Sequence, residues 1–552
     1  MKKNFLIFLL IIGLLVPASA FGQTAVRITP AERRMAGAIT ADQLKDYLYF
    51  VASDAMGGRD TPSAGLDVTA EFIKMQLSRW GFKPAGDNGT FFQKIAIKSE
   101  SLDTANNLLQ VDGKQFSLND DFFRMTGNGS ANALMVFAGS GWVVKSKGIN
   151  AYNGVDVNGR IVVLTGEGFP NPNTITRPPA GITQADLNGT KGTDWADPLT
   201  YARQNGAAGI ILIGSPQIQT GWGQIRNFFS RGSSYPEKLR EGNSNPAADT
   251  MPVVLVSDKV AAAIFEGTAG KESTTPFNID KTVSVTTMSK AETKWTQNVV
   301  ALWEGSSPTL KNEMVAIGAH YDHVGTNPNA RGDDKIWNGA DDDGSGTVAV
   351  LAIAEALAKS KVRPKRSILF VWHAGEEKGL WGSEYFNKFP TVDIKKVVAQ
   401  LNIDMIGRSL DPNNVIKCDQ PGKRCNEELT KAHEIYVIGS EMMSSTLGAV
   451  TKGTNNAFLK LDYNYKYDDP KDPNRFFFRS DHFNYAQNGI PVVFWFDGVH
   501  EDYHQPTDHP DKIDYQKMEK VTRTIFLTMW EVSELRTRPA VDKQLPAELT
   551  QR

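Results

Sequence analysis

The sequence predicts an α/β fold built on a mostly parallel, mixed sheet that is sandwiched by helices. From residue 296 onward, apolar runs of strand length alternate with helical patterns, which is typical of parallel strands buried on both faces of a sheet. The composition is that of a globular chain, with 41% hydrophobic and 22% charged residues. At 552 residues, the chain is long enough for roughly two to four domains. We therefore expect the sheet to form one domain of several.

Four apolar segments define the predicted sheet, at residues 315–318, 367–372, 397–403 and 490–495. A helix is expected from Thr347 to Ser360 after the first segment, and another near Gly382 after the second. Helical patterns begin near residues 41 and 68, and residues 30–124 are expected to be an N-terminal part of the same domain. Its main part is expected over residues 291–538.

Residues 125–290 predict a separate, β-rich accessory domain. Buried strands are expected at 160–164, 209–213 and 252–256, and long loops rich in Gly, Asn and Pro separate them. All eight histidines lie between His320 and His509, so none falls in this segment. Histidine chemistry therefore belongs to the C-terminal half. The alternative for residues 125–290 is that they extend one larger domain.

The first twenty residues predict a secretory signal peptide, residues 1–20. Lys2 and Lys3 precede an apolar core from Phe5 to Val16, and Ala18-Ser19-Ala20 supplies the Ala-x-Ala end. The core is shorter than the roughly 20 residues that span a bilayer, and no later segment is long and apolar enough. We expect an exported protein, periplasmic or extracellular, without stable membrane insertion after cleavage. A buried N-terminal helix is the alternative.

The net charge limits the classes of partner that the chain can bind, and the cysteines bear on the cellular compartment. The formal net charge of −2 argues against general nucleic-acid binding, which needs a basic surface. Cys418 and Cys425 are the two cysteines, and they flank a Pro-Gly pair. In an exported protein this close pair is expected to form a disulfide, with two reduced thiols as the alternative.

Acidic and histidine side chains follow the predicted strands, where the carboxyl ends of parallel strands form one edge of the sheet. Each strand, or the loop after it, delivers at least one such group. The residues are His320, Asp322, Asp342, Glu376, Glu377, Asp404 and His504. Carboxylates are almost never buried without a partner, so a bound cation is the simplest explanation of this pattern.

Imidazoles and carboxylates together are ligands that suit zinc. Two histidines and three carboxylates can hold two ions if one carboxylate bridges them, and such a pair can lower the pKa of a shared water. Glu376 and Glu377 point in different directions because they are adjacent, so one can ligate while the other acts as general base. Cobalt or manganese could occupy the same ligands.

These motifs resemble the dinuclear zinc aminopeptidases of the M28 peptidase family. The resemblance implies a zinc exopeptidase-like fold and two Zn²⁺ ions bridged by Asp342, although Asp341 and Asp343 stand beside it. It implies that His320 and Asp404 bind one zinc, that Glu377 and His504 bind the other, and that Glu376 is the general base. It also implies that Asp322 orients the imidazole of His320 without binding the metal itself. Segment 125–290 resembles an inserted protease-associated (PA) domain, through residues 159–163 and 206–210.

The expected function is therefore an exported zinc exopeptidase that acts on peptide substrates, most simply an aminopeptidase. Three rivals remain open. A carboxypeptidase would bind a free carboxylate through arginines, for which Arg408 and Arg479 are candidates. A glutaminyl cyclase would use one zinc, and a receptor-like ectodomain would have lost the chemistry. The roles of His323, His482, His500 and His509 stay open, while His373 is expected to pack and His433 to be exposed.

Overall fold

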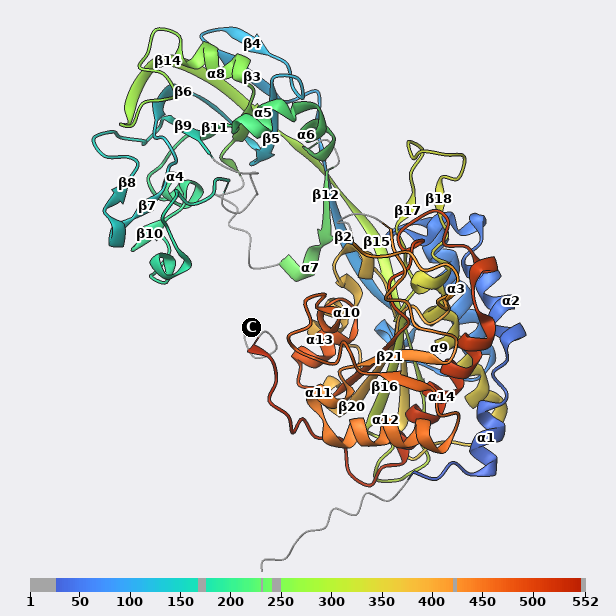
Figure 1. Ribbon diagram of the computed structural model, residues 1–552. Helices are drawn as coiled ribbons and strands as arrows, with labels where there is room; N and C mark the ends of the chain where they lie inside the picture. Colours follow the sequence, from blue (N-terminus) through green and yellow to red (C-terminus); the bar gives the residue numbers. More distant parts are fainter. Residues whose placement is uncertain (1–25, 167–174, 230–231, 241–249, 420–423, 548–552) are drawn as a thin grey trace, which may run out of the picture.

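The computed structural model describes residues 26–166, 175–229, 232–240, 250–419 and 424–547. They form two bodies, each with its own sheet (Figure 1). The predicted signal peptide, residues 1–20, lies outside the described residues. Within them, no helix is both long and apolar enough to cross a bilayer. Cys418 and Cys425 are joined by a disulfide, as expected from their spacing.

The main sheet has ten strands, and its centre is parallel. Along the sheet the order is β12 (Ser233–Pro236), β2 (Phe92–Leu102), β15 (Ser289–Trp303), β19 (Ser367–His373), β16 (Met314–His320), β20 (Val397–Ile403), β23 (Val492–Phe496), β21 (Glu434–Ile438) and β22 (Asp462–Asn464), with β1 (Lys83–Pro84) paired to β15. Strands β19, β16, β20 and β23 are mutually parallel. The expected mixed sheet is therefore confirmed, with all four predicted strands adjacent at its centre.

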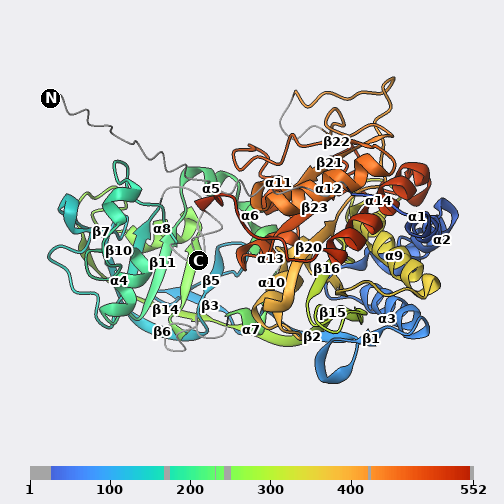
Figure 2. The ribbon, with the colours of Figure 1, turned by 90° about the horizontal axis from the view of Figure 1, so that it is seen from below.

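Alternating side chains of these strands bury against helices on both faces. Val315 and Ile317 of β16 face a core formed with α1 (Pro30–Ala36), α2 (Ala41–Val51), α3 (Ala64–Arg79), α9 (Gly346–Ser360), α12 (Ser445–Ala457) and α14 (Tyr515–Glu534). Met314 and Ala316 face the opposite core, formed with α10 (Trp381–Lys388), α11 (Ser440–Met443) and α13 (His482–Gln487). Figure 2 shows these two helix groups on opposite sides of the sheet. The N-terminal helices α1, α2 and α3 thus pack into the core of the main body.

The second body contains an eight-stranded sheet. Its order is β4 (Lys114–Phe116), β3 (Leu108–Val111), β14 (Phe277–Thr287), β6 (Gly129–Phe137), β9 (Ile161–Thr165), β11 (Gly209–Ile213), β13 (Val253–Val256) and β5 (Phe122–Thr126). Helix α8 (Asp258–Phe265) covers one face, and α4 (Pro198–Gln204), α5 (Pro216–Thr220) and Ile225 of α6 (Trp222–Phe229) cover the other. The assignment of this body as a PA-like domain stays a prediction.

The boundary between the bodies differs from the expected one at residue 125. Strands β3 and β4 precede that residue, yet they pair within the second sheet. The chain crosses between the bodies on β2 and β15, which pair antiparallel over their whole shared length, and β12 pairs with β2 (Figure 1). The second sheet therefore begins at Leu108, because three short strands before and around residue 125 complete it.

Candidate metal centre

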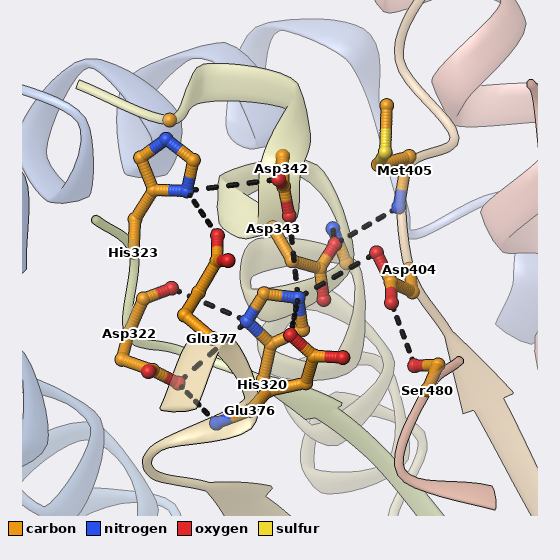
Figure 3. Close-up of polar contacts among 12 residues, drawn as sticks. His320, Asp322, His323, Asp342, Asp343, Glu376, Glu377, Asp404, Met405 and Ser480 are labelled. Atoms are coloured by element: carbon orange, nitrogen blue, oxygen red, sulfur yellow. Dashed lines mark hydrogen bonds and ion pairs between the residues drawn. The ribbon is translucent and has the colours of Figure 1, made fainter. Parts of the chain in front are cut away.

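The parallel strands deliver the predicted side chains to one edge of the main sheet. His320 is the last residue of β16, and Asp404 directly follows β20. Glu376 and Glu377 lie in a short 3-10 helix just after β19. His504 lies in the loop after β23, and Asp342 lies in the turn before α9. Figure 3 shows most of these groups converging on one small volume.

Asp342 stands between two imidazoles. Its Oδ1 lies 3.3 Å from Nε2 of His320, and its Oδ2 lies 3.0 Å from Nε2 of His504. Asp404 approaches the same nitrogen of His320, with Oδ1 at 3.6 Å, and Glu377 approaches that of His504, with Oε2 at 2.9 Å. The two carboxylate oxygens of Asp342 therefore face two separate groups of ligand atoms.

The two sequence neighbours of Asp342, Asp341 and Asp343, have other partners. Asp341 Oδ1 accepts a hydrogen bond from the backbone of Gly407 at 2.7 Å, and its Oδ2 lies 3.2 Å from Nε2 of His500. Asp343 Oδ1 accepts from the backbone N–H groups of Gly346 and Met405. Asp343 nevertheless lies within ligand distance of His320 and Asp404. Of the three aspartates, Asp342 is the one whose two oxygens meet both imidazoles.

Several of these buried atoms lack a hydrogen-bond partner in the described structure. They include Asp342 Oδ2, Asp343 Oδ2, Glu377 Oε1 and His504 Nε2. Unpaired buried polar atoms are costly, and imidazole nitrogens with carboxylate oxygens are the usual zinc ligands. Two groups of side chains can hold an ion: His320 with Asp343 and Asp404, and His323 with Asp342, Glu377 and His504. The donor set therefore fits divalent metal.

The pKa values show carboxylates crowded in a region of low dielectric. Burial raises the pKa of Glu376 well above its ordinary value; His320 opposes this rise, while Asp404 and Glu377 add to it. Burial alone would lower the pKa of His320, but Asp404 and Glu376 raise it well above its ordinary range. A bound cation is the arrangement that stabilises such a cluster.

Further polar groups hold the candidate ligands in place. Nδ1 of His320 lies 3.2 Å from the carbonyl oxygen of Asp322 and 3.7 Å from its Oδ1. The same Asp322 Oδ1 accepts a hydrogen bond from the backbone of Glu376 at 3.1 Å. Ser480 donates to Asp404 Oδ2 at 2.6 Å (Figure 3). Asp322 thus contacts both the imidazole and the chain segment of Glu376, which suits the orienting role predicted for it.

A pocket opens beside these groups. Asp342, Glu376 and Asp404 form its polar side. Its other walls come from Met405, Phe476, Arg479, Phe494, Phe496, Val499 and Tyr503. The candidate ligands therefore face a cavity whose remaining surface is mostly apolar.

Comparison with known proteins identifies the segment that carries this centre. Residues 298–529 match peptidase family M28. A probable leucine aminopeptidase 2 of Aspergillus oryzae is 32% identical over 213 residues, or 38% of this chain and 35% of that protein. Leupeptin-inactivating enzyme 1 of Streptomyces exfoliatus is 34% identical over 22% of this chain and 25% of its own length.

The chain thus spans about a third or less of the curated relatives that it matches. Among solved structures, an aminopeptidase from Aneurinibacillus sp. strain AM-1 covers 93% of this chain and 97% of its own, with a TM-score of 0.47 and 17% identity. Every predicted ligand, together with Glu376 and Asp322, lies inside the M28 segment.

Two residues of the M28 segment reach the centre without having been assigned a role from sequence. His323 is fully buried, and its Nδ1 lies 2.8 Å from Glu377 Oε1 and 3.7 Å from Asp342 Oδ2. Tyr503 lines the pocket and stacks on His504 with ring centroids 4.0 Å apart. Both are next to predicted site residues in sequence, which is the one signal that could have selected them.

The remaining histidines of this M28 segment have structural partners. His373 Nε2 contacts the hydroxyl of Tyr485 at 3.1 Å, so it packs as expected. His482 stacks on Phe494, and burial lowers its pKa to about 3. His500 pairs with Asp341, His509 lies 3.0 Å from Asp334, and the ring of His433 contacts the carbonyl of Lys460.

Proposed function

We propose that this chain is an exported, zinc-dependent aminopeptidase with two Zn²⁺ ions bridged by Asp342. The observation that carries the proposal is the placement of the two Asp342 oxygens, 3.3 Å from His320 and 3.0 Å from His504. His320 and Asp404 would hold one zinc, and His504 and Glu377 the other. When bound, a zinc pair lowers the pKa of a shared water and polarises a carbonyl group.

Glu376 is proposed as the general base. Its carboxylate lines the pocket, and its backbone is held by Asp322. A carboxylate within reach of the attacking water can accept its proton. It takes a proton from the attacking water and then gives it to the leaving amine, so that it ends the cycle as a carboxylate.

The pocket supports a preference for apolar N-terminal residues. Phe476, Phe494 and Phe496 give it a largely hydrophobic wall. His482 behind Phe494 has its pKa lowered to about 3 by burial, so it adds no charge at neutral pH. The relative from Aspergillus oryzae is named as a leucine aminopeptidase. Peptides that begin with leucine or a similar residue are therefore the proposed substrates.

A carboxypeptidase is the second candidate. The two arginines considered for binding a substrate carboxylate, Arg408 and Arg479, have different surroundings in the structure. Arg408 is buried and donates to Asp502 at 2.9 Å, so its charge is already paired. Arg479 lines the pocket, where it lies over the ring of Phe476. Arg479 is thus the residue that could bind a substrate carboxylate.

Metal content and a matched substrate set test the proposal. Zinc per purified chain is measured, together with hydrolysis of leucine p-nitroanilide, its N-acetylated form and a peptide with a blocked N-terminus. Two zincs with chelator-sensitive release from the free amine alone support the aminopeptidase. Release of C-terminal residues from the blocked peptide supports the carboxypeptidase. One zinc or none contradicts the bridging role of Asp342.

Export is also part of the proposal. The Cys418–Cys425 disulfide supports it, because disulfides persist in oxidising compartments such as the periplasm and the cell exterior. Cell fractionation and the mass of the mature chain test this: we expect loss of residues 1–20. A full-length chain in the cytoplasm would contradict it.

A further inference from the structure

Arg59 is a buried cation whose hydrogen bonds, among the described residues, all go to main-chain oxygens. It lies outside the matched M28 segment, in the turn before α3, and its side chain is fully buried. Its guanidinium donates to four backbone carbonyls: Val51 and Asn338 at 2.7 Å, Gly339 at 2.9 Å and Tyr321 at 3.0 Å. Within the described residues it forms no ion pair. Four of its five N–H groups are therefore directed at the chain's own backbone rather than at an acid.

Three of these four oxygens belong to the two segments that carry metal ligands. Tyr321 stands between His320 and Asp322, and the carbonyls of Asn338 and Gly339 begin the turn that leads to Asp342. The carbonyl of Arg59 also accepts the backbone N–H of His323 at 3.1 Å. One residue thus connects the end of β16 to the turn of the bridging aspartate.

The local backbone is built to insert this side chain. Gly57, Gly58 and Arg59 all have left-handed backbone conformations, with φ values of 55°, 68° and 50°. A Cβ atom on Gly58 would overlap the carbonyl oxygens of Gly325 and Trp337. Those residues form the strands β17 (Gly325–Thr326) and β18 (Ile336–Trp337), which link the His320 segment to the Asp342 turn. The turn therefore packs closely against the segment between His320 and Asp342, to which Arg59 donates hydrogen bonds.

We propose that Arg59 is a positioning residue for the metal centre, holding His320 and Asp342 at the separation that two ions need. The inference rests on the metal site proposed above. Arg59 also interacts electrostatically with Asp322, Asp342 and Asp343. A positive charge by itself opposes binding of another cation. Positioning and charge therefore make opposite predictions, because removal of Arg59 weakens metal binding in the first case and strengthens it in the second.

The test compares Arg59→Met and Arg59→Lys with the control Arg366→Met in the full chain. Arg366 is equally buried but precedes β19, at the opposite end of the strands, where it donates to Glu313 and to the carbonyl of Leu535. Zinc dissociation constants are measured by competition with a chromogenic chelator. The unfolding temperature of each metal-free protein and the visible absorption spectrum of the Co²⁺-loaded protein are recorded alongside.

We expect both Arg59 variants to bind zinc at least about tenfold more weakly than wild type, with an altered Co²⁺ spectrum. Arg366→Met should lower the unfolding temperature and change zinc affinity less than twofold. Arg59 variants that match Arg366→Met in zinc affinity, or an Arg59→Met protein that binds zinc more tightly than wild type, would overturn the inference. If Arg59→Met does not fold, Arg59→Lys decides, since it keeps the charge but cannot reproduce the four hydrogen bonds. A wild-type chain that binds no zinc instead overturns the proposed function itself.

Discussion

The two large sheets of this protein both have parallel strands at their centre, but different residue types follow those strands. Each has four adjacent parallel strands: β19, β16, β20 and β23 in the main sheet, and β6, β9, β11 and β13 in the second. In the main sheet, the residues at or after the carboxyl ends include His320, Glu376 and Asp404. In the second sheet, the strands are followed instead by Ala138-Gly139, Gly166, Gly214-Ser215 and Ser257-Asp258.

The difference shows that a parallel sheet brings its strand ends together at one edge, while the residue types at those ends decide whether a candidate metal site forms there.

Buried aspartates also have different partners in the two bodies. Asp197 of the second body is fully buried, but it pairs with Lys191 at 2.6 Å and accepts the backbone N–H of Thr200. Asp342 instead has two imidazoles as its neighbours, His320 at 3.3 Å and His504 at 3.0 Å. A carboxylate that pairs with a lysine can stabilise a fold, whereas carboxylates grouped with imidazoles form a donor set that can bind metal.

The largest expected effect comes from Glu376→Gln. The amide keeps the shape but cannot accept the proton, so kcat for leucine p-nitroanilide should fall by about 10³-fold while two zincs per chain remain. Glu355→Gln on α9 is the matched control, because Glu355 hydrogen-bonds Tyr47 and Gln43 away from the pocket. Substantial activity in Glu376→Gln would remove this residue from the mechanism.

The next effect contrasts a buried aspartate from each body. Asp404→Asn should weaken zinc binding by more than about 100-fold, since changes to groups behind the ligands already cost about 10–100-fold. Asp197→Asn should leave zinc affinity unchanged and cost about 1 kcal/mol of stability, because its partner Lys191 is partly solvated. Chelator competition and denaturant unfolding measure the two quantities. Equal zinc affinities in the two variants would contradict the proposal that Asp404 binds zinc and Asp197 does not.

A third comparison concerns the aromatic residues of the two bodies. Phe476→Ala should lower kcat/KM for leucine p-nitroanilide by about tenfold relative to alanine p-nitroanilide, because the pocket loses apolar contact with the larger side chain. Phe277→Ala, which removes a ring packed on Phe137 in the second sheet, should leave that ratio unchanged. A ratio that moves equally in both variants would argue against the pocket as the side-chain site.

The smallest effect concerns a crowded carboxyl far from the parallel strand ends. Burial, with Glu32 and Glu534 nearby, raises the pKa of Glu531 from 4.5 to about 7. The folded state therefore binds more protons than the unfolded state between these values, so this carboxyl's contribution to stability is present below pH 4.5 and is lost as pH rises through about 7. Glu531 is partly exposed, so solvent screens its charge, and Glu531→Gln should stabilise the protein by only about 1 kcal/mol at pH 8.

The same variant should have no effect on stability at pH 4, where the carboxyl is protonated in both states. Urea unfolding at the two pH values measures the difference. A gain in stability that is the same at pH 4 and pH 8 would show that the carboxyl's charge is not its cause.

Much of the main sheet was predictable because its strands are continuous apolar runs. Segments 315–318, 367–372, 397–403 and 490–495 correspond to β16, β19, β20 and β23. The strands β2 and β15 were harder to predict, since their outer parts are exposed and polar where they run between the bodies. The short strands β3 to β5 lack a long apolar run, which is why the second sheet begins before the predicted boundary.

The sequence by itself determined which residue types stand at the parallel strand ends, because strand order and apolar pattern are local properties. Only the tertiary structure decided which of three consecutive aspartates faces both imidazoles, since Gly407, Met405 and His500 engage the other two. It also paired Arg408 with Asp502 and brought Arg59 to the backbone of the ligand segments. Such choices depend on side-chain direction and on partners distant in the chain, and these exist only once the elements have packed.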